Sequence, residues 1–193
     1  MKTALRKVPH VFFWVFVLFF SPQIIYAENT YEEKVEFATS IQEILAYLNG
    51  AQVVHKYGNH ESAHHHMNYP LLETYPKISD ELEIDAEYNK KLEFILHILK
   101  NLNLGVSDEN FKEQVYFIEK ILNEGEDLII SSELQDDPKF KKQVAIHLLE
   151  RAKIKLMESL TLTGLESITT YEQGLFLINQ AKVVFNLITP NEF

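Results

Sequence analysis

Apolar residues recur at three- and four-residue steps through most of the chain beyond residue 30, which is the period of an amphipathic helix. The first such segment covers residues 30–57, where the stripe includes Ile41, Leu48 and His55. It continues in phase past Gly50, although an interior glycine costs about 1 kcal/mol relative to alanine. The pattern therefore predicts one continuous helix over 30–57.

Turn residues separate this segment from the next. Gly58 followed by Asn59 predicts a helix end and a cap for a new helix, because the asparagine side chain accepts hydrogen bonds from the first turn. The new helix covers residues 60–82. Pro70 and Pro76 each lack a backbone N–H, so this helix is expected to be kinked or split.

Four further helical segments follow. They cover 86–104, 107–131, 138–163, and a stretch from Thr169 or Thr170 to a point before Pro190, where Thr170 and Gln173 fit a capping box. Short connections make sequential helices antiparallel neighbours. The predicted fold is all-α: an up-and-down helical bundle of four to five long helices plus one Pro-broken helix, after a cleaved signal peptide.

The N-terminus has the three parts of a secretory signal. Lys2, Arg6 and Lys7 precede an apolar run over 11–20, and Ala27 offers a small residue before a cut. The alternative is a membrane anchor, but a spanning helix needs about 20 apolar residues. We expect a signal peptide over 1–27 and a single helical domain over 28–193. The mature chain is then extracytoplasmic (periplasmic, secreted or at the cell surface) and has no stable membrane span.

Charge and cysteine content exclude several classes of protein. Removing residues 1–27 changes the formal net charge from −10 to −13, which repels nucleic acid, although this acidity is also explained by solubility alone. The chain has no cysteine, which excludes disulfides and a cysteine-linked lipid anchor. Stability must come from a core or a bound ion.

Histidines concentrate near the first turn. Five of the eight histidines are His55, His60, His64, His65 and His66. Residues four apart share a helix face, which pairs His60 with His64 and Glu61 with His65. His55 lies on the apolar stripe just before the turn. We expect His55, His60 and His64 to be the core ligands of a metal ion, with Glu61, His65 and Glu73 as further ligands.

Imidazole and carboxylate ligands without thiolate suit zinc, copper, nickel or iron, and Met67 adds a soft ligand for copper. The alternatives are a solvated histidine-rich face and a pH-responsive patch. A metal site needs at least three side chains in one coordination shell. A structural or interaction bundle without a cofactor instead exposes an apolar patch of several hundred Å².

Catalytic patterns are missing from the sequence. It contains no G-x-S-x-G, no H-E-x-x-H and no cysteine nucleophile. A single E-x-x-H, from Glu61 to His64, lacks the second copy that a di-iron bundle requires. The sequence predicts no enzyme and no catalytic residue.

The segment Gly58-Asn59-His60-Glu61-Ser62-Ala63-His64, followed by Tyr69-Pro70 and Glu73, resembles helical extracytoplasmic domains found in or near bacterial and archaeal iron permeases. The resemblance implies an accessory metal-handling domain and carries over no catalytic residue. The chain departs from the permeases in lacking their transmembrane helices and their Arg-Glu-x-x-Glu motif. The sequence therefore predicts an exported soluble helical protein that binds a transition metal ion through a His-rich turn, with a possible protein partner at the cell surface.

Overall fold

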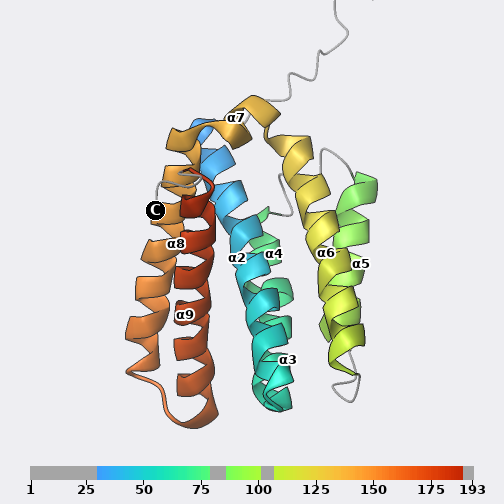
Figure 1. Ribbon diagram of the computed structural model, residues 1–193, viewed down its shortest axis with the longest axis vertical. Coiled ribbons are helices and arrows are strands. Elements are labelled where there is room, and N and C mark those ends of the chain that lie inside the picture. The colour runs from blue at the N-terminus through green and yellow to red at the C-terminus, as the bar shows by residue number, and fades with distance from the viewer. Residues whose placement is uncertain (1–29, 79–85, 101–106, 189–193) are drawn as a thin grey trace, which may run out of the picture.

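The computed structural model describes residues 30–78, 86–100 and 107–188, and all regular structure in these ranges is helical (Figure 1). The elements are α2 (Tyr31–Lys56), α3 (His60–Tyr69), the π-helix η1 (Pro70–Thr74), α4 (Tyr75–Ile78), α5 (Ala86–Lys100), α6 (Asp108–Ile129), α7 (Ser132–Asp136), α8 (Pro138–Ser159) and α9 (Gly164–Asn186). The predicted all-α bundle is confirmed. The predicted signal peptide, residues 1–27, lies outside the described residues.

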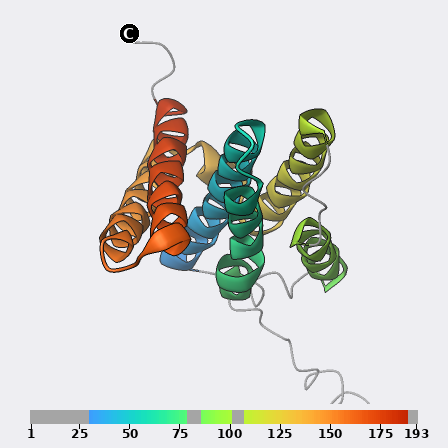
Figure 2. The ribbon, with the colours of Figure 1, turned by 90° about the horizontal axis from the view of Figure 1, so that it is seen from below.

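Helix α2 is the centre of the bundle. Its residues 37–41 are buried one after another, whereas a helix that packs on a single layer buries only one stripe. The reason is that α2 contacts α3, α6, α8 and α9. Figures 1 and 2 show it between the α8–α9 pair and the α5–α6 pair. The buried surface of this helix is therefore wider than the single apolar stripe predicted for 30–57.

Gly50 allows α2 and α9 to approach closely. A Cβ atom at position 50 would overlap the ring of Phe176, which lies on α9. The predicted continuity of the first helix through Gly50 is confirmed, and the glycine is explained by this contact. The helix tolerates the lower propensity of glycine because the aromatic ring packs where a side chain would otherwise be.

The turn between α2 and α3 is the one that the sequence predicts. Gly58 has a φ of 78°, a left-handed conformation that glycine adopts without steric cost. Asn59 caps α3, and its Oδ1 accepts a hydrogen bond from the Ser62 N–H at 3.2 Å. This turn brings the end of α2 beside the start of α3.

The proline-containing segment is continuous rather than split. Helices α3, η1 and α4 follow one another without an interruption, and the chain passes Pro70 in one π-helical turn. The Tyr75 N–H donates to the Pro70 carbonyl, which is the wider hydrogen-bond spacing of a π-helix. The wider turn accommodates the missing N–H of Pro70 without breaking the helix.

Two predicted boundaries near the C-terminus are wrong. Helix α8 ends at Ser159, and α9 begins at Gly164 rather than at Thr169 or Thr170. Thr169 is buried inside α9, and its Oγ1 donates to the Leu165 carbonyl at 3.1 Å. A threonine hydroxyl can bond back to its own helix as well as cap one, so the capping-box pattern was misleading here.

The helices of the described ranges give no candidate for a membrane span, since none combines sufficient length with sufficient apolar character.

Candidate functional site

The structure brings two of the predicted metal ligands together. His55 is 3 % exposed and its ring stacks on Phe111 at 4.6 Å. The centroids of the His55 and His60 rings lie 4.7 Å apart in an edge-to-face arrangement. His55 Nδ1 lies 2.8 Å from Asp108 Oδ1 at the start of α6, so Nδ1 carries the proton and donates to the carboxylate. This is the carboxylate–histidine pairing that orients metal ligands in many proteins.

The remaining predicted ligands have different surroundings from this pair. His64 is half-buried, and its Nδ1 is buried without a hydrogen-bond partner. Glu61 and His65 are exposed. In the part of the chain that the structure describes, no three histidine, aspartate or glutamate side chains are grouped as a metal shell requires. The six-residue ligand set therefore stays a prediction, of which the structure joins His55 and His60.

His66, which the ligand set leaves out, is the fully buried histidine of the cluster. Its Nε2 lies 2.9 Å from Glu172 Oε2 on α9 and 3.2 Å from Ser62 Oγ. Ser62 also donates to Glu172. Burial lowers the pKa of His66, and the neighbouring Glu172 carboxylate only partly opposes this.

This Ser–His–Glu group does not have the geometry of a hydrolase triad. In a triad, one ring nitrogen faces the serine and the other faces the carboxylate. Here Nε2 faces both, and Nδ1 is buried without a partner. The group instead links α3 to α9 through polar contacts within the core.

A second buried polar group links α2 to α8. Glu43 is 2 % exposed and accepts a hydrogen bond from Tyr47 Oη at 2.8 Å. Arg151 pairs with both Glu43 and Glu36. Burial, reinforced by the Glu43 charge, raises the pKa of Tyr47 far above its usual value. Every charge in this group has a partner, which makes it a structural element rather than a binding site.

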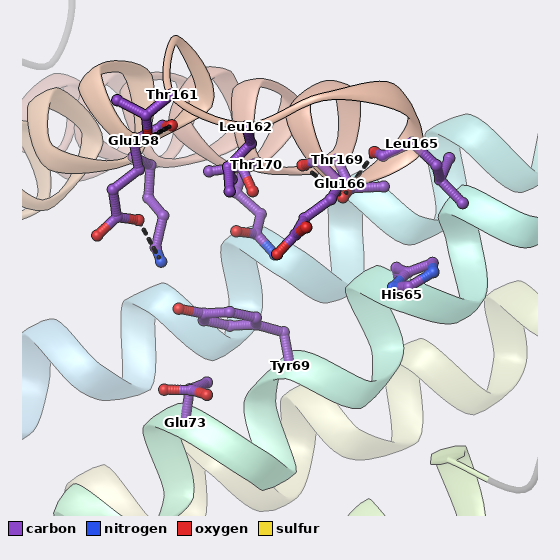
Figure 3. Close-up of a pocket in the computed structure, with 12 residues that line it drawn as sticks. His65, Tyr69, Glu73, Glu158, Thr161, Leu162, Leu165, Glu166, Thr169 and Thr170 are labelled. Atoms are coloured by element: carbon purple, nitrogen blue, oxygen red, sulfur yellow. Dashed lines mark hydrogen bonds and ion pairs between the residues drawn. The ribbon is translucent and has the colours of Figure 1, made fainter.

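His65 and Glu73 both line one pocket at the end of the α8–α9 hairpin. Figure 3 shows them with Tyr69 on the α3–η1 segment, opposite residues of α8, α9 and the loop between them. The pocket has a volume of about 720 Å³. His55 and His60 do not line it, so the predicted ligands belong to two separate places.

The outer surface of α8 and α9 is the main exposed apolar region. Eleven of the nineteen exposed large apolar side chains lie on these two helices or at their C-caps. They are Ile146, Leu149, Ile154, Met157, Leu160, Ile168, Tyr171, Leu175, Val183, Phe185 and Leu187. We call this set the α8–α9 apolar face.

Sequence reasoning missed the partners of the buried histidines. Asp108 lies 53 residues from His55, and Glu172 lies 106 residues from His66. Nothing in the local pattern links positions so far apart. The seven-residue repeat of apolar positions in α9 is a signal that was present in the sequence and points to the α8–α9 apolar face.

The likeness of residues 58–73 to iron-permease-associated domains stays a prediction drawn from those residues. No protein-family model, no curated protein and no solved structure matches this chain.

Proposed function

We propose that this chain is an extracytoplasmic interaction module that assembles with a second copy of itself through the α8–α9 apolar face. The proposal is carried by one observation, the concentration of exposed apolar side chains on α8 and α9. Large exposed apolar patches mark interaction sites, and this is the feature that distinguishes an interaction bundle from a metal site. The module has no catalytic role in this proposal.

The spacing on α9 indicates what covers this face. Positions 168, 171, 175, 178, 182 and 185 alternate between steps of three and four residues, and all but Lys182 are apolar. That is the spacing of a coiled-coil seam, so the partner surface is helical. Helix α8 has the same spacing at 146, 149, 153, 156 and 160, with Lys153 as the polar position.

The two seams form one surface. Leu156 of the α8 seam lies directly over Gly174 of α9, so the α8 seam borders the neighbouring helix. Figure 1 shows α8 and α9 side by side at one edge of the molecule. Two adjacent antiparallel helices need two more to complete a four-helix bundle. A second α8–α9 hairpin supplies them in a twofold, self-complementary interface.

The distribution of charge is compatible with a second copy on this face. Residues 138–188 carry seven Lys and Arg and only four Glu, whereas the whole chain has a net charge of −10. Most of the negative charge therefore lies outside α8 and α9. Pairing through α8 and α9 keeps the acidic surfaces of the two copies away from each other. Exposed Glu150 and Lys153 form no ion pair within the described residues. In an antiparallel crossing of α8 with its copy at this turn, each Glu150 faces the Lys153 of the other copy.

The test uses residues 28–193, which contain every described helix. Light scattering after size exclusion should show a dimer for this protein and a monomer for Leu149→Glu/Tyr171→Glu, since two charges would enter the apolar interface. Phe117→Glu is the matched control, because Phe117 is an exposed aromatic on α6, away from this face. A wild-type monomer up to millimolar concentration, or a dimer lost equally in the control, would refute the proposal.

Transition-metal binding is a second candidate, favoured by the contact between the His55 and His60 rings and by the Asp108 carboxylate on His55. Calorimetric titration with Zn²⁺, Cu²⁺ and Ni²⁺ should then show one-to-one binding that is lost in His60→Ala/His64→Ala. His65→Ala should leave metal binding unchanged, since His65 lines the pocket at the end of the α8–α9 hairpin and not the His55–His60 pair. Weak binding of several ions that neither variant alters would count against a specific site.

A further inference from the structure

The pocket in Figure 3 is separate from the α8–α9 apolar face and from the His55–His60 pair. Its upper side in this view is formed by the end of α8, the following loop and the first turns of α9, where Glu158, Leu162, Leu165 and Glu166 are labelled. Tyr69 of α3 forms the opposite side. A volume of about 720 Å³ lies within the range of small-molecule sites in proteins.

The charged groups around the pocket have an excess of carboxylates. Glu73, Glu158 and Glu166 line it, and Lys155 is the lysine among its lining residues. Lys155 Nζ lies 3.0 Å from Glu158 Oε2 and 4.7 Å above the Tyr69 ring, so it is already paired. Burial alone would lower the pKa of Lys155, but hydrogen bonds to Tyr69 and Glu158 outweigh it and raise the pKa. Lys155 is therefore charged, and it neutralises Glu158.

The other two carboxylates have no such partner. Glu73 and Glu166 form no ion pair within the described residues. They come from opposite sides of the pocket, one from η1 and one from α9 (Figure 3). A ligand that bridges the pocket between them must carry positive charge at two points.

A second and independent feature points to a ligand. Gln173 is 4 % exposed and Thr170 is 8 % exposed, and both line the pocket. Neither side chain forms a hydrogen bond with the rest of the described chain. Their polar atoms are not among the fully enclosed groups that lack a partner, so they are accessible to a molecule in the pocket. A bound molecule with N–H groups satisfies the amide oxygen and the hydroxyl.

We propose that this pocket binds a linear organic polycation, a diamine or polyamine. Its terminal ammonium groups pair with Glu73 and Glu166, and an inner N–H donates to Gln173. Its methylene chain packs on Leu162 and Leu165, which supply the apolar part of the lining. A metal ion fits less well, because in the described part of the chain these carboxylates are not grouped with a third ligand. The proposal does not depend on self-association through the α8–α9 apolar face.

The test is calorimetric titration of residues 28–193 with spermidine, with Mg²⁺ as a probe of charge alone. We expect one-to-one spermidine binding that weakens about tenfold in Glu166→Gln and in Gln173→Leu. Glu113→Gln is the control, because it removes the same charge from exposed α6 surface outside the pocket.

Three outcomes would overturn the proposal. One is the absence of spermidine binding at millimolar concentration. Another is equal weakening by Glu113→Gln, and the third is full displacement of spermidine by equimolar Mg²⁺. Both results would indicate attraction to the acidic surface as a whole. Glu166 is exposed, so Glu166→Gln keeps the test valid even if Gln173→Leu, which alters a buried position, unfolds the protein.

Discussion

At the scale of single residues, the buried polar groups determine how this protein responds to pH and substitution. Glu126 is half-buried on α6, and burial raises its pKa to about 7. A hydrogen bond from Gln42 only partly offsets this, and Gln42 in turn accepts one from Gln180 at 2.7 Å. The Glu126 carboxyl group thus meets a polar chain that joins three helices, but its burial still favours the protonated form.

Replacing Glu126 by glutamine tests this directly. A raised pKa contributes stability that is present below about pH 4.5 and is lost as pH rises through about 7. We expect Glu126→Gln to stabilise the protein by about 1–2 kcal/mol at pH 8 and to change little at pH 4. Urea unfolding at both pH values measures the difference. Equal effects at the two values, or the same gain in exposed Glu113→Gln, would contradict the assignment.

Arg151 is the residue whose loss should cost most. Glu43 is nearly inaccessible, and without Arg151 its nearest remaining cation is Lys77 at 4.0 Å. Breaking a buried pair from one side costs about 3–5 kcal/mol because the other charge stays buried. We expect Arg151→Met to destabilise the protein by that amount in urea unfolding. Glu43→Gln/Arg151→Met should recover part of it, and a double variant as unstable as the single one would argue against the pairing.

Residue-level predictions from the sequence succeeded where local spacing decides the outcome. The stripe position of His55 predicted its burial, and Gly58-Asn59 predicted a turn and a cap. They missed Asp108 and Glu172, which meet the histidines only through tertiary packing. Periodicity ranks which faces are inward, but it carries no information about which distant helix lies opposite.

At the scale of elements, helix order was predictable and helix ends were less so. Helices α6 and α8 begin within one residue of the predicted starts at 107 and 138, and Ser107 and Asp137 cap them. The connection between α8 and α9 covers only residues 160–163, and α9 begins at Gly164. This start was not predicted, because Gly164 has a φ of 63° and glycine in that conformation usually ends a helix. At Pro70 the segment, predicted to be kinked or split, is continuous through a π-helical turn, since α3, η1 and α4 all pack on α2.

The crossing of α2 and α9 depends on Gly50. An alanine there gains about 1 kcal/mol of helix propensity but overlaps the Phe176 ring. Overpacking of this kind costs about 1–3 kcal/mol, so Gly50→Ala should lower stability or leave it unchanged despite the propensity gain. Adding Phe176→Leu should relieve the overlap and raise the melting temperature above that of Gly50→Ala. A clear stabilisation by Gly50→Ala alone would show that the ring moves away freely.

At the scale of the whole molecule, the fold separates three features along its width. The α8–α9 apolar face lies at one edge, α2 fills the centre, and α5 with α6 forms the other side (Figures 1 and 2). The all-α bundle followed from periodicity and turn residues alone. The α8–α9 apolar face was not predicted from the sequence. A helix with apolar residues on two sides shows little contrast between an apolar and a polar face, so its sequence does not reveal which side is exposed. Only the packing shows which of the two sides is covered.

Pairing of two copies through this face is the central claim, and charge exchange at its middle tests it most directly. Sedimentation equilibrium of residues 28–193 should show a reversible dimer. Glu150→Lys should weaken it, because two lysines of one copy then face two of the other. Glu150→Lys/Lys153→Glu should restore it, because opposite charges meet again across the twofold axis. A monomer at every concentration, or a dimer that neither variant changes, would contradict pairing through α8 and α9.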